Sequence, residues 1–218
     1  MQEKSKEPGN RIILFRDVSF VVGGILIFAI FIHHSIPLRT VAYAGLAGAA
    51  ILISYSTRYV PLLYAFGLSP FTKKILIYIV PAFLIGGGLG VLTRHLFDLS
   101  LLPQKVTRIA IIAPLVGITE EVIFRGYIQG YMRPAGRVIT ILYSSAAHTL
   151  YKILVIYSLS IPLQINFLYL ALLTFLAGIL FGTIRELSDS VVPPSVAHAL
   201  FDIVLYGGFA LAPVWVWS

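Results

Sequence analysis

Long apolar runs separated by short polar connections dominate the chain. Windows of about 17 to 25 mostly apolar residues match the length that a helix needs to cross the hydrocarbon core of a bilayer. Turn-forming stretches such as "GLSPFTKK" and "RPAGR" separate them, and the alternating pattern of a membrane β-barrel is absent from the sequence. The pattern predicts an all-α fold, a polytopic transmembrane helix bundle of about seven spans, at about 17–33, 40–57, 75–93, 108–130, 138–158, 166–184 and 191–211.

Composition supports a membrane protein. Of the 218 residues, 58% are hydrophobic and 11% are charged, whereas soluble domains have roughly 25% charged residues. The chain has no cysteine, which excludes a disulfide framework, a thiolate metal site and a cysteine nucleophile. The net charge of +7 comes from basic residues in short connections instead of one basic face with interleaved aromatics, so nucleic acid is not an expected partner. The expected partner is the lipid bilayer.

Lys and Arg are distributed unequally between the two sides of the predicted bundle. Cytoplasmic connections of membrane proteins carry the excess of these residues. The side with the amino-terminal tail contains Lys4, Lys6, Arg11, Arg16, Arg58, Lys73, Lys74, Arg125, Arg133, Arg137 and Arg185. The other side contains Arg39, Arg94, Lys105, Arg108 and Lys152. The count predicts a multi-pass protein with a cytoplasmic amino terminus, and it places the acidic pair of the fourth span in the cytoplasmic half.

The chain divides by composition into three parts. Residues 1–16 form a polar tail that we expect to be cytoplasmic, residues 17–107 form the amino-terminal transmembrane helices, and residues 108–218 form a core with ionisable residues. The first apolar run is long for a signal peptide, and "HHSIPLRT" separates it from the small residues of a cleavage site, so we expect a retained span. Glycines at four-residue spacing predict close helix packing, at Gly86 with Gly90, Gly126 with Gly130 and Gly178 with Gly182.

Ionisable residues within spans are concentrated in the second half of the chain. Exposing one to lipid costs about 2.5 to 3.5 kcal/mol on the insertion scale, so such residues normally face the bundle interior or a wet cavity. The three spans that carry them contain Glu120, Glu121 and Arg125, then His148 and Lys152, and finally His198 and Asp202. The sequence therefore predicts a polar site formed between residues 108 and 211.

Helical spacing separates the roles of the two glutamates. Glu121 and Arg125 are four residues apart, so they share a face and can pair, whereas Glu120 is rotated by about 100° and is expected to be free. A carboxylate base needs a water and a neighbour for the second proton, and Glu120 with His148 can provide both. His198 and Asp202 are also four residues apart and are candidates to stabilise an oxyanion. The set fits hydrolysis of a carbonyl compound such as a peptide bond.

Each of these residues also has a structural interpretation. Glu121 with Arg125 can be a structural ion pair, and an isolated intramembrane histidine is often a packing residue. Snorkelling or pairing is the default for Lys152, interfacial anchoring for Arg94, and a solvated turn for "ELSDS" at 186–190. Zinc is a competing mechanism, because histidines and carboxylates can ligate it, but an H-E-x-x-H helix is absent from the sequence and the arginine disfavours a nearby cation.

Three motifs carry a resemblance to a known family. "EEVIFR" at 120–125, "SSAAH" at 144–148 and "HALFD" at 198–202, the last preceded by "GILFG", occur in order on separate spans. Together they resemble the CAAX-processing and bacteriocin-processing family of intramembrane endopeptidases, the prenyl-protein protease type also called the abortive-infection family. The resemblance covers about residues 108–205.

The resemblance implies a glutamate-dependent protease with its catalytic core in the last four helices, around a cavity open toward the cytosol. Glu120 resembles the water-activating base and His148 its catalytic partner. Glu121 and Arg125 resemble the supporting pair, while His198 and Asp202 resemble the oxyanion-stabilising set.

Two positions depart from the family pattern. Ser144 stands where the second motif usually has phenylalanine, which leaves the packing around His148 open, and Asp202 stands where asparagine is common. An ionised Asp202 would repel an oxyanion, so this residue must be protonated, or bound to His198, to assist.

We expect an intramembrane glutamic-type endopeptidase that needs no cofactor and cleaves a membrane-associated or lipidated peptide or protein on the cytoplasmic side. The alternative from another class is a non-catalytic immunity or scaffold protein that binds a peptide or partner in the same polar cavity. A proton-coupled transporter is a third interpretation, weakened by the lack of paired interrupted helices in the two halves.

Overall fold

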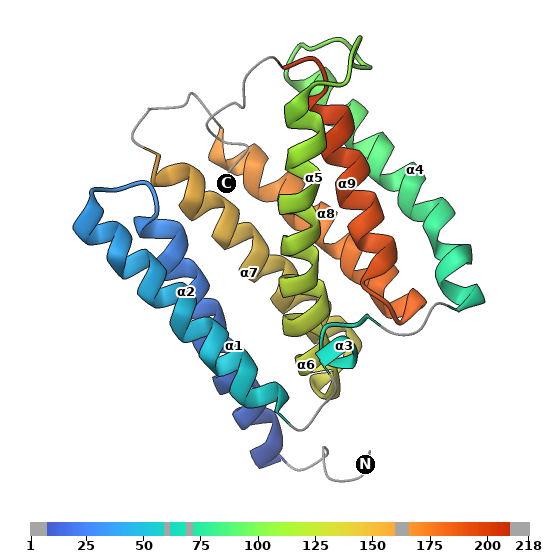
Figure 1. Ribbon diagram of the computed structural model, residues 1–218. Coiled ribbons are helices and arrows are strands. Elements are labelled where there is room, and N and C mark those ends of the chain that lie inside the picture. The colour runs from blue at the N-terminus through green and yellow to red at the C-terminus, as the bar shows by residue number, and fades with distance from the viewer. Residues whose placement is uncertain (1–7, 59–61, 69–71, 160–165, 210–218) are drawn as a thin grey trace.

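A computed structural model describes residues 8–58, 62–68, 72–159 and 166–209, and in these ranges the chain is helical with no strand (Figure 1). The predicted all-α class is therefore confirmed. The helices are α1 (Pro8–Phe31), α2 (Ile36–Thr57), α3 (Leu62–Ala65), α4 (Lys73–Leu96), α5 (Arg108–Glu121), the π-helix η2 (Val122–Ile128), α6 (Gln129–Met132), the 3-10 turn η3 (Arg133–Ala135), α7 (Arg137–Tyr157), α8 (Phe167–Ser188) and α9 (Val192–Tyr206).

Five helices of the described chain are long and apolar enough to cross a membrane, by length and composition. They contain the candidate spans Ile13–Phe31, Ile36–Thr57, Lys73–Leu96, Arg137–Tyr157 and Phe167–Ser188. The predicted count of about seven is not confirmed, because two of the windows fall on shorter α-helices. The α5 helix has 14 residues before the π-helix begins, and α9 has 15, which at about 1.5 Å per residue gives about 22 Å. Residues 210–211 of the last window lie outside the described residues, as do residues 1–7 of the tail.

The helices that carry the ionisable residues lie in the middle of the bundle. In Figure 1, α5 occupies the centre, with α9 and α4 on one side and with α7 and the α1–α2 hairpin on the other. The α7 helix also packs against α8, and α8 packs against α9. Large apolar side chains remain exposed on the outer helices, and only 11% of the α2 window is buried in the protein. This apolar exterior suits contact with lipid.

Glycines allow the closest helix contacts, as their spacing predicts. A Cβ at Gly86 of α4 would lie 2.0 Å from the carbonyl oxygen of Ala197 in α9. At Gly126 it would lie 2.5 Å from the carbonyl oxygen of Phe66. At Gly178 it would lie 2.9 Å from the Cβ of Ser145. These approaches bring α9 against α4, and α8 against α7, and so place the polar residues of α7 and α9 near one another.

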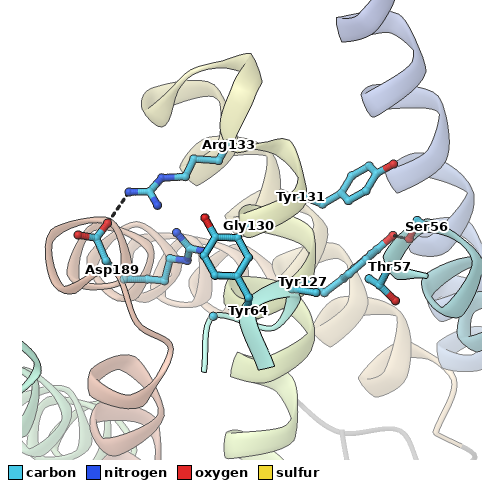
Figure 2. A pocket seen from close by; sticks show the side chains of 11 residues that line it. Ser56, Thr57, Tyr64, Tyr127, Gly130, Tyr131, Arg133 and Asp189 are labelled. Atoms are coloured by element: carbon cyan, nitrogen blue, oxygen red, sulfur yellow. Dashed lines mark hydrogen bonds and ion pairs between the residues drawn. The ribbon is translucent and has the colours of Figure 1, made fainter. Parts of the chain in front are cut away.

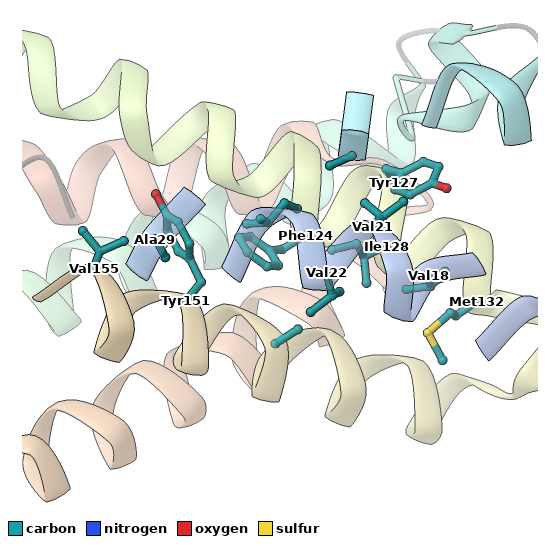
Figure 3. Close-up of a cluster of buried hydrophobic side chains, with 13 residues drawn as sticks. Val18, Val21, Val22, Ala29, Phe124, Tyr127, Ile128, Met132, Tyr151 and Val155 are labelled. Carbon is teal, nitrogen blue, oxygen red and sulfur yellow. The ribbon is translucent and has the colours of Figure 1, made fainter. Parts of the chain in front are cut away.

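The amino-terminal helix α1 packs against the apolar side of the π-helix. Buried side chains of α1 pack against the apolar side of η2, α6 and α7 in one hydrophobic cluster (Figure 3). Phe124 of η2 and Val21 of α1 lie in this cluster, at 1% and 0% exposure. Because the apolar side of η2 is covered by α1, its Arg125 side chain is directed toward the polar interior.

Arg94 holds the end of α9. Its guanidinium donates hydrogen bonds to the carbonyl oxygens of Leu205 and Gly207, each at 2.9 Å, and its side chain is almost fully buried. The last carbonyl groups of a helix lack partners within the helix, which explains this contact. Interfacial anchoring of Arg94 is therefore a wrong expectation: the side chain points into the bundle and fixes the helix that carries His198.

Candidate active site

The predicted site residues of four helical elements converge on one place. Glu120 and Glu121 end α5, Arg125 lies in η2, His148 comes from α7, and His198 and Asp202 come from α9. All six are buried, with exposures of 6% or less. Four of them, together with Lys152, line a cavity of about 710 Å³ whose remaining wall consists largely of apolar side chains of α4, α7, α8 and α9. The cavity is within the size range of small-ligand sites.

Side chains of neighbouring helices bind two main-chain carbonyl groups of the π-helix. The Ser144 hydroxyl donates a hydrogen bond to the carbonyl oxygen of Phe124 at 2.7 Å. The Nε of Arg185 donates to the carbonyl oxygen of Arg125 at 3.0 Å. π-Helical segments occur frequently at functional sites, where they change the direction of side chains.

Arg125 links the second glutamate to the first histidine. Its Nη1 lies 3.3 Å from Oε1 of Glu121 and 2.8 Å from Nδ1 of His148. The predicted pairing of Glu121 with Arg125 is therefore present. A guanidinium has only donors, so the Nδ1 of His148 must accept, and in the neutral ring the proton then resides on Nε2.

Glu120 is held by two side chains of α7. The Nε2 of His148 lies 3.2 Å from Oε2 of Glu120, and the Nζ of Lys152 lies 2.7 Å from Oε1. The proton on Nε2 of His148 is thus directed at the carboxylate. The expectation that Glu120 is free is wrong, because Lys152 follows His148 by one helical turn and reaches the same carboxylate. Among the described residues, Arg125 forms its ion pair with Glu121 and not with Glu120, as the helical spacing predicts.

His198 approaches both glutamates. Its Nδ1 lies 2.9 Å from Oε1 of Glu121, and its Nε2 lies 3.8 Å from Oε2 of Glu120. Asp202 is more distant, with Oδ1 4.0 Å from Nε2 of His198, which is longer than a hydrogen bond. Gly117 leaves the room for both α9 side chains, since a Cβ there would lie 2.5 Å from Oδ2 of Asp202.

Aromatic packing around His148 comes from an unexpected position. The ring of Phe124 lies 4.7 Å from the imidazole, centroid to centroid, and Tyr151 stacks at 6.4 Å. Ser144, which stands where the family pattern usually has phenylalanine, is fully buried and binds the main chain of η2 instead. The π-helix therefore supplies the aromatic neighbour of His148.

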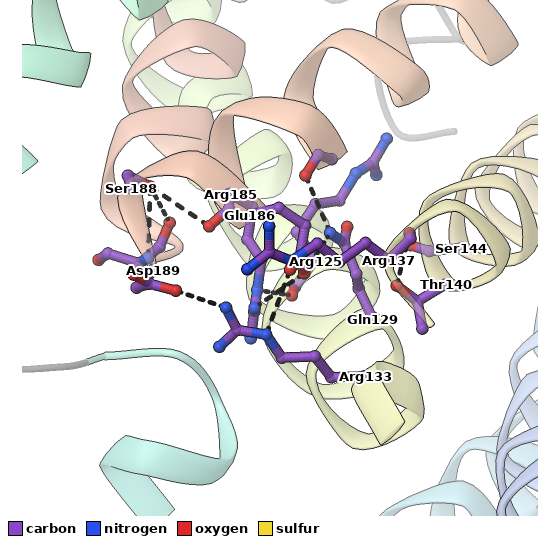
Figure 4. Close-up of polar contacts among 12 residues, drawn as sticks. Arg125, Gln129, Arg133, Arg137, Thr140, Ser144, Arg185, Glu186, Ser188 and Asp189 are labelled. Carbon is purple, nitrogen blue, oxygen red and sulfur yellow. Dashed lines mark hydrogen bonds and ion pairs between the residues drawn. The ribbon is translucent and has the colours of Figure 1, made fainter. Parts of the chain in front are cut away.

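A second buried network extends from Arg125 toward the end of α8 (Figure 4). Arg185 and Gln129 both donate to Oε1 of Glu186, at 3.1 and 3.0 Å, and Arg133 lies 3.2 Å from its Oε2. Glu186 is only 6% exposed, so a solvated turn at 186–190 is a wrong expectation for this residue. This network is hard to predict from the sequence, because an arginine near the end of a span, such as Arg185 in the last turn of α8, usually lies at the membrane–water interface.

Metal binding would face an electrostatic obstacle at this site. Lys152 lies within ion-pair distance of Glu120, and Arg125 lies within ion-pair distance of Glu121. In the described part of the chain, no group of three or more histidine, aspartate or glutamate residues is arranged to hold a metal ion. A divalent cation between the glutamates would be repelled by the positive charges of Arg125 and Lys152.

The geometry agrees with a comparison against protein families. Residues 102–204 match the model of a family described as Type II CAAX prenyl endopeptidase Rce1-like. The match supports the resemblance of this segment to the CAAX endopeptidase family. All three sequence motifs lie inside the matched segment, and the suspected family is confirmed. No curated protein and no solved structure matches the chain.

The family match and the apolar helices together support an integral membrane protein with a protease-type role in general, acting on a protein substrate.

Replacing Ser144 with alanine should destabilise the fold by about 0.5 to 1.5 kcal/mol, because the carbonyl oxygen of Phe124 would lose its side-chain donor and keep only the main-chain N–H of Gln129. The measurement is the unfolding midpoint of the purified protein in detergent. Ser145→Ala is the matched control, since the Ser145 hydroxyl is buried without a hydrogen-bond partner among the described residues. Equal midpoints for the two variants would contradict the proposed support of η2 by Ser144.

Proposed function

We propose that this protein is an intramembrane endopeptidase in which Glu120 activates water to hydrolyse a peptide bond. The observation that carries the proposal is the contact of this one buried carboxylate with His148 and Lys152, and its proximity to His198, three side chains that line the cavity. A carboxylate in such a setting can accept a proton from a water molecule that attacks a carbonyl carbon.

The reaction balances with this set of groups. A water molecule forms a bond to the carbonyl carbon while Glu120 takes one of its protons, and the carbonyl oxygen becomes an oxyanion. When the carbon–nitrogen bond breaks, the protonated Glu120 returns its proton to the departing amine. A carboxylate offers about four lone-pair sites, so Glu120 can bind this proton while it still accepts hydrogen bonds from His148 and Lys152.

His148 acts on the orientation of Glu120. Its Nε2–H donates to Oε2 of Glu120, and its Nδ1 is occupied by Arg125. Arg125 in turn is held by Glu121, which makes the pair Glu121–Arg125 a positioning unit for the histidine. Positioned proton acceptors typically contribute 10²- to 10⁴-fold to a rate.

His198 is the proposed donor to the oxyanion. Glu121 accepts from its Nδ1, so in the protonated ring the Nε2–H remains as a donor, and the residue lines the cavity. A donor placed in advance at the position of the developing charge lowers the barrier. Asp202 lies 4.0 Å from this nitrogen, too far for a hydrogen bond, and it assists the oxyanion in its protonated form.

Lys152 is a positioning residue in this account. Its ammonium group lies 2.7 Å from Oε1 of Glu120, on the wall of the cavity. The ion pair keeps the carboxylate in its ionised form and restricts its rotation. Both effects favour a base that is ready to accept a proton.

The substrate class follows from the lining and the topology. A mainly apolar cavity within a membrane bundle suits an apolar segment of a membrane-associated peptide, with or without a lipid. The excess of Lys and Arg on the amino-terminal side supports a cytoplasmic amino terminus, and with it a cytoplasmic location for the end of the bundle near Glu120. We propose catalysis without a metal because both glutamates already have cationic neighbours.

Glu120→Gln should lower kcat/KM for peptide cleavage by at least about 100-fold, because the amide cannot accept the proton of water. Cleavage of a membrane-anchored reporter peptide by purified protein in liposomes provides the measurement. Asp98→Asn is the matched control, since Asp98 is an exposed carboxylate with φ 54°, a conformation that asparagine tolerates. Wild-type cleavage by Glu120→Gln would reject the assignment, and loss of wild-type cleavage in EDTA would reject the metal-free mechanism.

Lys152→Met should lower kcat by about tenfold or more with little change in KM, because the cavity keeps its shape while Glu120 loses a positioning contact. Lys152→Arg should retain most of the activity, since it keeps the charge. Lys105→Met is the control for loss of a lysine far from the site, at an exposed position. Full activity of Lys152→Met would show that the ion pair with Glu120 serves stability alone.

A further inference from the structure

A second pocket, of about 380 Å³, lies at the ends of the helices (Figure 2). Its lining includes Thr57, the last residue of α2, and Asp189, which follows α8. Tyr64 of α3 and Gly130 of α6 form other parts of the wall. Since α2 and α8 are candidate spans, the pocket is at the level where their membrane-crossing segments end.

The buried side chain of Arg185 lines this pocket. Arg185 is 4% exposed, its Nε binds the carbonyl oxygen of Arg125, and its Nη1 binds Glu186. Its Nη2 lies on the pocket side: a Cβ at Gly130 would be 2.9 Å from this atom, and a Cβ at Gly67 would be 3.6 Å away. Within the described residues, Nη2 has no hydrogen-bond acceptor. The guanidinium therefore presents one donor to the pocket.

The charges around the pocket favour an anion. Arg133 pairs with Glu186 and Asp189, and Lys74 also pairs with Asp189. Hydrogen bonding from Lys74, then from Arg133, holds the pKa of the Asp189 carboxyl below its usual value. The three cations Lys74, Arg133 and Arg185 face the two carboxylates of Glu186 and Asp189, which leaves a net charge of +1. An acceptor with negative charge would satisfy both this excess and the unused donor.

We propose that this pocket binds a phosphate group through Nη2 of Arg185, supplied by an anionic phospholipid headgroup or by free phosphate. The location at the helix ends fits a headgroup, because basic pockets between membrane helices bind such groups on the cytoplasmic side. Guanidinium donors suit phosphate oxygens in geometry and charge. The hydroxyl of Tyr64, whose side chain lines the pocket and is largely exposed, adds a further donor at its mouth.

Occupancy of the pocket would act on the candidate active site through one residue. The Nε of Arg185 holds the carbonyl oxygen of Arg125, and the Arg125 guanidinium holds His148. A phosphate on Nη2 would restrict the guanidinium of Arg185 and therefore the π-helix. The proposal itself concerns binding, so it stands or fails independently of proteolysis.

The test uses the full chain purified in detergent. Native mass spectrometry measures retention of dioleoyl phosphatidylglycerol against dioleoyl phosphatidylcholine at equal concentration, and a separate arm measures protection from thermal unfolding by inorganic phosphate. We expect the wild-type protein to retain phosphatidylglycerol about tenfold more than phosphatidylcholine, since the two lipids differ in net headgroup charge.

Two variants should prevent phosphate binding, one by removing the guanidinium and one by filling the space beside it. Arg185→Gln removes the donor and also weakens the contact with the main chain of Arg125, so it can affect folding. Gly130→Ala keeps Arg185 and places a methyl group 2.9 Å from its Nη2, where the ligand would lie. The matched controls are Gly88→Ala, whose Cβ meets nothing within 4 Å, and Arg108→Gln, an exposed arginine at the opposite end of the α5–α6 segment.

Loss of the preference for phosphatidylglycerol in Gly130→Ala, with both controls unchanged, supports the proposal with a lipid as the source. Protection by inorganic phosphate that Gly130→Ala abolishes, without a lipid preference, supports it with free phosphate as the source. The proposal is overturned if the wild-type protein shows neither effect. It is also overturned if Gly130→Ala binds these probes as the wild-type protein does.

Discussion

The burial of the Arg125 guanidinium is the constraint on which the site depends. A fully buried cation is very unfavourable unless it is paired and hydrogen-bonded, and here Glu121 and His148 provide the partners. Its own main-chain carbonyl is bound by Arg185. Because one residue joins a carboxylate, an imidazole and the π-helix, its position determines which nitrogen of His148 carries a proton. That choice directs the Nε2–H of His148 at Glu120.

The surrounding bundle explains how this charge is tolerated. The α1 helix covers the apolar side of η2, and glycines let α8 approach α7 closely enough to exclude lipid from the interior. The charged groups then meet one another instead of hydrocarbon. The cavity adjoins the titratable groups, and apolar side chains of α4 and α8 form part of its wall. A protected polar site with an adjacent apolar cavity is what hydrolysis of a membrane-associated peptide requires.

Much of this arrangement could be predicted from spacing and motifs. The helical class, the pairing of Glu121 with Arg125, and the different direction of Glu120 all follow from apolar run length and helical rotation. The partner of Lys152 could not be predicted, because whether this side chain extends to the interface or turns inward to Glu120 depends on the position of α5 relative to α7. The same holds for Arg185, whose sequence position resembles that of an interfacial cation. The span count is not confirmed for a local reason: a π-helix follows α5 after 14 residues, and α9 is short.

The protonation of His148 tests the central claim most directly. Nitrogen-15 NMR of histidine-labelled protein in detergent distinguishes the ring nitrogens, and His148→Gln assigns the signal among the five histidines. Acceptance from Arg125 requires a neutral ring with the proton on Nε2, so we expect an unprotonated Nδ1 and a protonated Nε2 at neutral pH. A ring protonated on Nδ1 would show that Arg125 does not control His148, and the proposed path from the buried arginine to Glu120 would be wrong.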